Sequence, residues 1–180
     1  MLRFFHIPKT AGMSICNAMG IPAGHAPIMN PKANDFVFSC VRNPYDRAVS
    51  AYWFIRQTQA RVAFNMAKTW KDVNEFWISF EKENKSPFGR LVANQIDFIR
   101  EVKGTGGISP RIETVLRYET LAEDWPAFAL LHDLPPLPHK NKSELRPATP
   151  WQEQLSDESI SKIGELYAED FETLNYERLV

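Results

Sequence analysis

The sequence FFHIPKTAGMS, at residues 4–14, places a short apolar run directly before a turn of Lys, Thr, Gly and Ser. The hydrophobic pattern predicts a buried strand over Leu2–Ile7 and a short helix over Gly12–Met19. A strand, a turn and a helix start in this order form a cradle, in which backbone N–H groups and the positive end of the helix dipole stabilise a phosphate or sulfate. Lys9 adds a full positive charge, so this stretch predicts a local anion site.

The order of residues in this turn differs from the GxxxxGK[ST] phosphate loop, in which the lysine comes late and stands beside a hydroxyl that holds magnesium. Here Lys9 comes early, directly after Pro8. This order suits a terminal group that is held without a metal, with Lys9 at the bridging oxygen on which charge develops as the group leaves. We expect no metal site, because the histidines and cysteines show no ligand spacing.

The composition indicates one globular domain over residues 1–180, with 44% hydrophobic residues. Lys and Arg number 21 against 22 Asp and Glu, so the net charge of -1 gives no broad basic field for nucleic acid. No run approaches the roughly 20 apolar residues of a membrane span, and the start lacks a signal-peptide pattern. We expect a soluble, cytoplasmic protein with two buried, reduced thiols, Cys16 and Cys40, in place of a disulfide.

A second informative stretch, VRNPYDRAVSAY at residues 41–52, follows the apolar run 35–41. That run predicts a second buried strand. We expect a helix to begin at once, with Asn43 as the N-cap, Pro44 in the first helical position and Asp46 where a capping box has an acid.

Two polar side chains of this stretch suit a phosphate. Arg42 ends the strand, and Ser50 lies two helical turns beyond the cap, on the same helix face as Asn43. A guanidinium and a hydroxyl can thus meet one phosphate from two directions. The alternative is a structural helix start, in which Arg42 and Arg47 are surface ion-pair residues.

The rest of the chain continues the alternation of strands and helices. Apolar faces at helical spacing predict helices around residues 73–80 and 92–99, and residues 113–117 predict a third strand before a helix that ends at Leu131. We expect a last helix from Ser156 that packs against the sheet with a stripe of Ile160, Ile163, Tyr167, Phe171 and Leu174. Strand–helix alternation implies parallel strands, so the predicted fold is α/β, a small parallel β-sheet flanked by helices.

Taken together, the two polar stretches resemble a known pair of motifs. HIPKTAGMS resembles the 5′-phosphosulfate loop of the sulfotransferases, typically HIPKTGGTS, and VRNPYDRAVSAY resembles their 3′-phosphate motif, typically VRDPYERLVSAY. The likeness is greatest to the carbohydrate-type sulfotransferases related to the heparan and chondroitin enzymes. A looser similarity extends to residues 116–121 and 139–143 and to Tyr167, Asp170, Phe171 and Tyr176.

The resemblance implies a P-loop-like three-layer fold and transfer of a sulfuryl group from 3′-phosphoadenosine 5′-phosphosulfate (PAPS) to an acceptor hydroxyl on a glycan or similar compound, with 3′,5′-ADP as product. Carried onto this chain, the 5′-phosphosulfate is cradled by Lys9, Thr10, Ala11, Gly12, Met13 and Ser14. Arg42 and Ser50 hold the 3′-phosphate, and the loop around Asn141 and Lys142 closes over the nucleotide.

Two residues of the first motif depart from the family pattern. Ala11 stands where the family has glycine and is small enough to be tolerated. Met13 stands where the family has threonine, which removes a hydroxyl donor from the cradle. Its neighbour Ser14 keeps one hydroxyl.

Transfer to a hydroxyl also needs a base that takes the acceptor proton, and the pKa of histidine suits this task near neutrality. His25 falls between the first helix and the second strand, where the glycan sulfotransferases that the chain resembles often have a His or Glu base. We predict His25 and Lys9 as catalytic residues, with Asp46 and Glu75 as alternative bases, and His6 as a packed residue. The alternative for His25 is an exposed loop histidine.

Two other functions stay open from the sequence. One is a P-loop kinase that uses ATP and a metal, which the missing GK[ST] disfavours. The other is a non-catalytic nucleotide-binding protein that keeps the cradle without an acceptor groove. An acceptor surface for sugar rings and an ordinary core are both possible roles for the aromatic residues Tyr52, Trp53, Phe54, Trp70 and Trp77.

Overall fold

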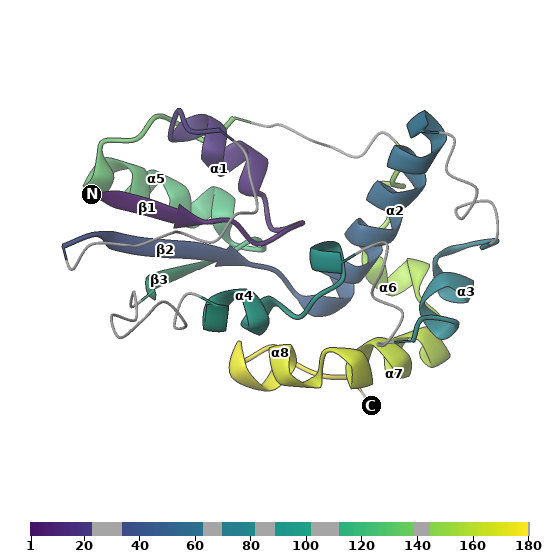
Figure 1. Cartoon of the computed structure of the whole chain (residues 1–180). Helices are drawn as coiled ribbons and strands as arrows, with labels where there is room; N and C mark the ends of the chain where they lie inside the picture. Colours follow the sequence, from purple (N-terminus) through teal and green to yellow (C-terminus); the bar gives the residue numbers. More distant parts are fainter. Residues whose placement is uncertain (23–33, 63–69, 82–88, 102–111, 139–144, 180) are drawn as a thin grey trace. The chain divides into compact units, whose positions relative to one another are not determined.

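The computed structural model describes residues 1–22, 34–62, 70–81, 89–101, 112–138 and 145–179. The described strands form one three-stranded sheet in the order β1-β2-β3, and both pairings are parallel (Figure 1). The strands are β1 (Leu2–Phe5), β2 (Phe36–Val41) and β3 (Ile112–Arg117). The predicted α/β class, a small parallel sheet flanked by helices, is confirmed.

The chain forms two compact units. The sheet unit comprises Met1–Arg42 and Gln95–Asn141, and the helical unit comprises Asn43–Asn94 and Lys142–Val180. The connection from β2 to β3 therefore leaves the sheet unit after Arg42, runs through the first part of the helical unit, and returns at Gln95. That the chain is a single domain stays a prediction.

The core of the sheet unit lies between the strands and the helices α1 (Gly12–Ala18) and α5 (Leu121–His132). Its members include Phe4, Ile15, Cys16, Phe38, Cys40, Leu116, Leu121, Trp125 and Phe128. The alternate strand residues Phe5, Val37 and Val41 face the other way and are buried as well. Both faces of the sheet are thus covered, as parallel sheets require.

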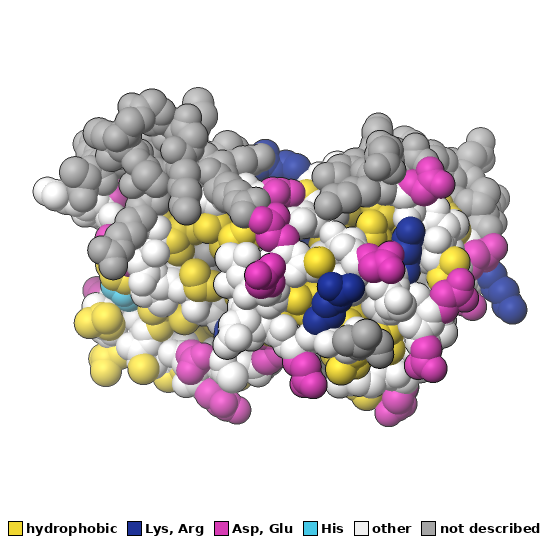
Figure 2. Space-filling view, turned by 90° about the horizontal axis from the view of Figure 1, so that it is seen from below, with side chains coloured by type: hydrophobic (Ala, Val, Ile, Leu, Met, Phe, Trp, Pro, Cys, Tyr) yellow, Lys and Arg dark blue, Asp and Glu magenta, His cyan; other side chains and the backbone are white. Residues whose placement is uncertain are grey.

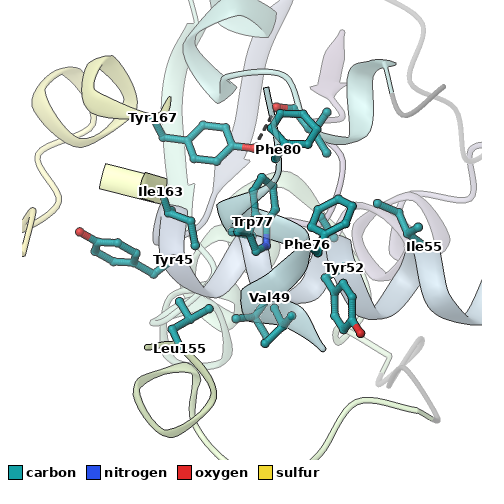
Figure 3. Close-up of a cluster of buried hydrophobic side chains, with 14 of the residues drawn as sticks. Tyr45, Val49, Tyr52, Ile55, Phe76, Trp77, Phe80, Leu155, Ile163 and Tyr167 are labelled. Atoms are coloured by element: carbon teal, nitrogen blue, oxygen red, sulfur yellow. Dashed lines mark hydrogen bonds between the residues drawn. The ribbon is translucent and has the colours of Figure 1, made fainter. Parts of the chain in front are cut away.

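The helical unit is built from α2 (Pro44–Val62), α3 (Val73–Ile78), the 3-10 helix η2 (Gly89–Leu91), α6 (Trp151–Gln154), α7 (Asp157–Leu166) and α8 (Ala168–Thr173). Its core is rich in aromatic residues, and the largest of them is Trp77, with no exposed surface (Figure 3). Edge-to-face contacts join the Trp77 ring to those of Phe76 and Tyr167, with centroids 4.9 and 5.9 Å apart. Such contacts add to the free energy gained by burial.

Helix starts in this unit follow the predicted capping chemistry. The side chain of Asn43 accepts hydrogen bonds from the backbone N–H groups of Tyr45 (2.9 Å) and Asp46 (3.4 Å), which confirms it as the N-cap of α2. Asp72 caps α3 by accepting from two backbone N–H groups, and Ser156 caps α7 by accepting from Ser159.

Two of the predicted elements have different bounds in the structure. Strand β1 ends at Phe5 because the pairing with β2 ends there, although His6 and Ile7 are buried. The helix near residues 92–99 begins only at Gln95, as α4 (Gln95–Glu101).

The predicted last helix is two helices, because Tyr167 leaves the helical conformation (φ -115, ψ 24) and donates its hydroxyl to the Val92 carbonyl at 2.9 Å (Figure 3). We expected its stripe to pack against the sheet, but the stripe contributes to the core formed with α2 and α3.

Candidate anion-binding site

The turn after β1 has an unusual backbone conformation. Lys9 and Ala11 have φ angles of 70 and 66, in the left-handed region. The other non-glycine residues with positive φ in the described part of the chain, Asp133 and Asn175, lie at helix ends, where this conformation is common. A left-handed L-residue costs roughly 1–2 kcal/mol, so the turn over residues 8–12 stores strain of the kind found at functional sites.

The turn is held from inside by buried side chains. The hydroxyl of Thr10, which has no exposed surface, donates to the Ile7 carbonyl at 2.8 Å. The ring of His6 is buried against the backbone of Gly12, where a Cβ atom would lie only 1.8 Å from its Nε2 and Cδ2 atoms. Gly12 is therefore required by this contact, and His6 is the packed residue that the sequence predicts.

The turn also contains several successive backbone N–H groups. Within the described chain, no residue accepts from the N–H groups of Thr10, Ala11, Gly12 or Met13. Successive N–H groups in a turn that alternates with left-handed residues form an anion-binding concavity. The side chain of Met13 is 45% exposed and that of Ser14 is buried.

Arg42 lies at the end of the neighbouring strand and contacts this turn. Its Nη1 atom donates to the Lys9 carbonyl at 3.2 Å, and its Cζ atom lies 3.8 Å from the ring centroid of Tyr118. Arg42 is 5% exposed, so its guanidinium is largely removed from solvent. The sheet unit thus brings together the predicted site residues Lys9 and Arg42, from the ends of adjacent parallel strands.

Two residues beside Arg42 were not predicted as part of the site. The fully buried Gln95 accepts from the Arg42 N–H at 2.9 Å and donates to the Arg42 carbonyl at 2.8 Å. Tyr118 supplies the stacking surface under the guanidinium. Tyr118 lies in residues 116–121, whose resemblance to the sulfotransferases could have indicated a role in the site. The sequence around Gln95 indicates only an amphipathic helix, so nothing in it predicts a contact with Arg42.

The helical unit holds the other polar residues of the second motif. Ser50 is buried on α2, as is Arg47, whose guanidinium donates to the carbonyls of Ala93 (2.9 Å) and Leu91 (3.4 Å). The alternative that made Arg42 and Arg47 surface ion-pair residues is therefore wrong, because both are buried and bond to backbone. Ser50 and Arg42 belong to different units, so their joint contact with one phosphate stays a prediction.

The two alternative bases have structural partners. Asp46 forms an ion pair with Arg146, and Glu75 accepts a hydrogen bond from the Lys71 N–H at the start of α3. Three predicted residues, His25, Asn141 and Lys142, lie outside the described residues.

The aromatic residues proposed for sugar rings divide between core and surface. Tyr52 and Trp77 are in the core, and Trp53 and Trp70 pack against it. Among the aromatic residues proposed for sugar binding, Phe54 is the exposed one, with 42% of its surface accessible to solvent.

Both cysteines are buried free thiols, as predicted. Burial raises the pKa of the Cys40 thiol, Glu119 adds to this increase, and the positive charge of Arg42 opposes it. The thiol is therefore protonated at neutral pH and takes no part in anion binding.

On the face shown in Figure 2, acidic and basic side chains are scattered among apolar and polar ones, and the Lys and Arg side chains visible there form no continuous patch. The described residues also contain no group of three His, Cys, Asp or Glu side chains arranged to hold a metal ion.

No described helix combines the length and apolar character needed to cross a membrane.

Comparisons of this chain with protein-family models, with curated proteins and with solved structures found no match.

Proposed function

We propose that the chain is a PAPS-dependent sulfotransferase with a P-loop-like fold, which transfers a sulfuryl group to a hydroxyl of a carbohydrate or similar acceptor. The observation that carries this proposal is the contact between its two motifs: the buried Arg42 guanidinium donates to the Lys9 carbonyl inside the strained turn. Two cationic residues from separate motifs meet where adjacent parallel strands end, which is the common place for a ligand in an open α/β sheet.

The donors of this site suit the two anionic ends of PAPS. The turn offers backbone N–H groups and the half-buried Lys9 for the 5′-phosphosulfate. The Thr10 hydroxyl donates inward, so it acts as a brace and the backbone carries the recognition. Arg42 offers a guanidinium, which suits the geometry of a phosphate, for the 3′-phosphate, and the sequence motif alone adds Ser50 to this role.

PAPS supplies an activated sulfuryl group, which is bonded to a phosphate through a bridging oxygen. The acceptor oxygen forms a bond to sulfur as the bond from sulfur to that bridging oxygen breaks. Lys9 stabilises the charge left on the bridging oxygen, and the base takes the acceptor proton. His25 is our proposed base, on the strength of its position in the sequence.

The P-loop kinase remains the second candidate enzyme, and a nucleotide-binding protein without activity remains the third candidate. Thermal unfolding of the chain with 3′,5′-ADP, or with ATP and magnesium, separates the first two. A ligand at 100 times its dissociation constant adds about 2.7 kcal/mol of stability. We expect stabilisation by 3′,5′-ADP, and stabilisation by ATP and magnesium alone would refute the sulfotransferase proposal. Failure of every hydroxyl acceptor to receive sulfate from PAPS would favour the third candidate.

The base is tested by His25→Ala. We expect loss of transfer by about 10²–10⁴-fold, the usual contribution of a general base, with unchanged affinity for 3′,5′-ADP. Transfer assays with PAPS and titration calorimetry measure the two effects separately. A fully active His25→Ala variant would move the role to Asp46 or Glu75.

A further inference from the structure

The backbone of Arg42 lies just beyond the last bond of the sheet. The final ladder contact of β2 is the hydrogen bond from the Tyr118 N–H to the Val41 carbonyl at 2.8 Å. One residue later, no described strand pairs with the buried N–H and C=O groups of Arg42, and the Gln95 carboxamide bonds to both. Gln95 therefore replaces a strand partner for one residue.

Fixing both backbone groups of a residue fixes the direction of its Cα–Cβ bond, from which the side chain extends. From this position the Arg42 guanidinium lies over Tyr118 and donates to the Lys9 carbonyl. A long side chain that is already ordered loses less conformational entropy when it binds an anion, and that gain appears as affinity.

We propose that Gln95 is a positioning residue, which holds the backbone of Arg42 so that the guanidinium is set for an anionic ligand before that ligand arrives. The proposal rests on the proposed function for the identity of the ligand, the 3′-phosphate of a nucleotide. Gln95 acts through Arg42, because its carboxamide is fully buried and both of its ends bond to the Arg42 backbone.

The test compares two glutamines that have the same bonding. Gln154 in the helical unit accepts from the Trp53 indole N–H at 2.9 Å and donates to the Thr149 carbonyl at 2.7 Å. Gln95→Met and Gln154→Met each keep a linear side chain and lose at least one accepted and one donated bond. Gln154→Met therefore shows how far the loss of two carboxamide hydrogen bonds away from Arg42 changes the ligand affinity and the Arg42 signal.

Two measurements are made on each folded variant. The first is the affinity for 3′,5′-ADP by calorimetry, and the second is the NMR signal of the Arg42 Nε–H group. Stacking on Tyr118 gives this signal a ring-current shift, assigned with Tyr118→Leu. In Gln95→Met we expect the shift to be lost and the affinity to fall about tenfold, the equivalent of roughly one charge-assisted contact. Gln154→Met is expected to change neither.

Arg42→Ala provides the final control, because Gln95 acts through this residue. The double variant with Gln95→Met should bind 3′,5′-ADP no more weakly than Arg42→Ala alone. Additive losses, or a weaker affinity with the Arg42 signal unchanged, would overturn the proposal. So would a Gln95→Met variant that keeps both the signal and the affinity.

The design separates this inference from the proposed function. If the unaltered chain does not bind 3′,5′-ADP, the proposed ligand is wrong, and the Arg42 signal alone decides whether Gln95 positions the side chain. If Gln95→Met does not fold, Gln95→Glu replaces it and is measured at a pH at which its buried carboxyl is ionised, since a carboxylate still accepts from the Arg42 N–H but cannot donate to the carbonyl. An unchanged Arg42 signal in Gln95→Glu overturns the proposal, and a shifted signal supports it.

Discussion

Arg42 and Arg47 lie five positions apart in the sequence and are both buried, but they make different contacts, one in the sheet unit and the other in the helical unit. In the helical unit, Arg47 and Tyr167 bond to three successive carbonyls, those of Leu91, Val92 and Ala93. These bonds tie an irregular segment to helices. In the sheet unit, Arg42 stacks on Tyr118 and contacts a turn with a strained backbone. Burial alone therefore does not separate the two arginines, and the strained backbone beside Arg42 is what makes that residue the candidate for a ligand site.

The region around Trp77 and the region around the turn bury different kinds of side chain. The helical unit packs aromatic rings in edge-to-face contacts around Trp77. The sheet unit buries polar side chains such as Thr10 and Gln95, whose hydrogen bonds are made to backbone near the turn. We infer that substitutions in the first region change stability, and that substitutions in the second change ligand binding as well.

Trp77→Ala should have the largest effect on stability. It removes a fully buried indole from the centre of the helical core and should lower the free energy of unfolding by about 3–5 kcal/mol. Urea unfolding followed by circular dichroism measures this loss. The folded fraction should bind 3′,5′-ADP with unchanged affinity.

Trp77→Phe is the matched control. The indole N–H of Trp77 has no acceptor among the described residues, so phenylalanine keeps an aromatic ring and gives up no hydrogen bond within that part of the chain. We expect a loss well below that of Trp77→Ala. Equal losses would show that the indole makes contacts beyond ring packing.

Arg47→Met and Arg42→Met separate the two arginines directly. Arg47→Met leaves two carbonyls without a charged donor and should cost about 2–3 kcal/mol of stability, with 3′,5′-ADP affinity retained. Arg42→Met should weaken 3′,5′-ADP binding about 100-fold, because a guanidinium that binds a phosphate with two parallel charge-assisted bonds is lost. The reverse pattern in calorimetry and urea unfolding would contradict the comparison between the units.

The sequence predicts most of the fold because apolar runs and capping residues are local signals. The run at 35–41 matches β2 (Phe36–Val41), and Asn43 caps α2 as expected. The break at Tyr167 could not be predicted, because it accompanies a hydrogen bond to Val92, a residue 75 positions away. The partner of the last helix was missed for the same reason: periodicity shows which side of a helix is buried, but it does not show that this side joins the core with α2 and α3.

The site was predictable only where its residues form motifs. Lys9 and Arg42 stand out from their neighbours in sequence, and the structure places the Arg42 guanidinium against the Lys9 carbonyl. Gln95 is separated from Arg42 by 53 positions and carries no signal of its own. The left-handed conformation of Lys9 and Ala11 was also hidden, because neither residue type favours it.

Gly12→Ala tests whether the turn is as tightly built as the contact with His6 indicates. The added methyl would overlap the His6 ring, so we expect a loss of about 1–3 kcal/mol in urea unfolding. The double variant with His6→Ala should recover part of this loss, because the ring is then absent. If Gly12→Ala is neutral, the His6 ring has room to move.

Ala11→Gly should have the smallest effect, and it is stabilising. Ala11 has a φ of 66, which glycine adopts without the steric cost borne by an L-residue. The greater freedom of glycine in the unfolded chain offsets part of this gain, so we expect a net gain of about 0.5–1 kcal/mol. Glycine is also the residue that the sulfotransferase motif has at this position, so the affinity for 3′,5′-ADP should be kept or increased. A destabilised Ala11→Gly variant would show that the turn relaxes without its left-handed alanine. The strain that distinguishes the sheet unit would then be smaller than the backbone angles indicate.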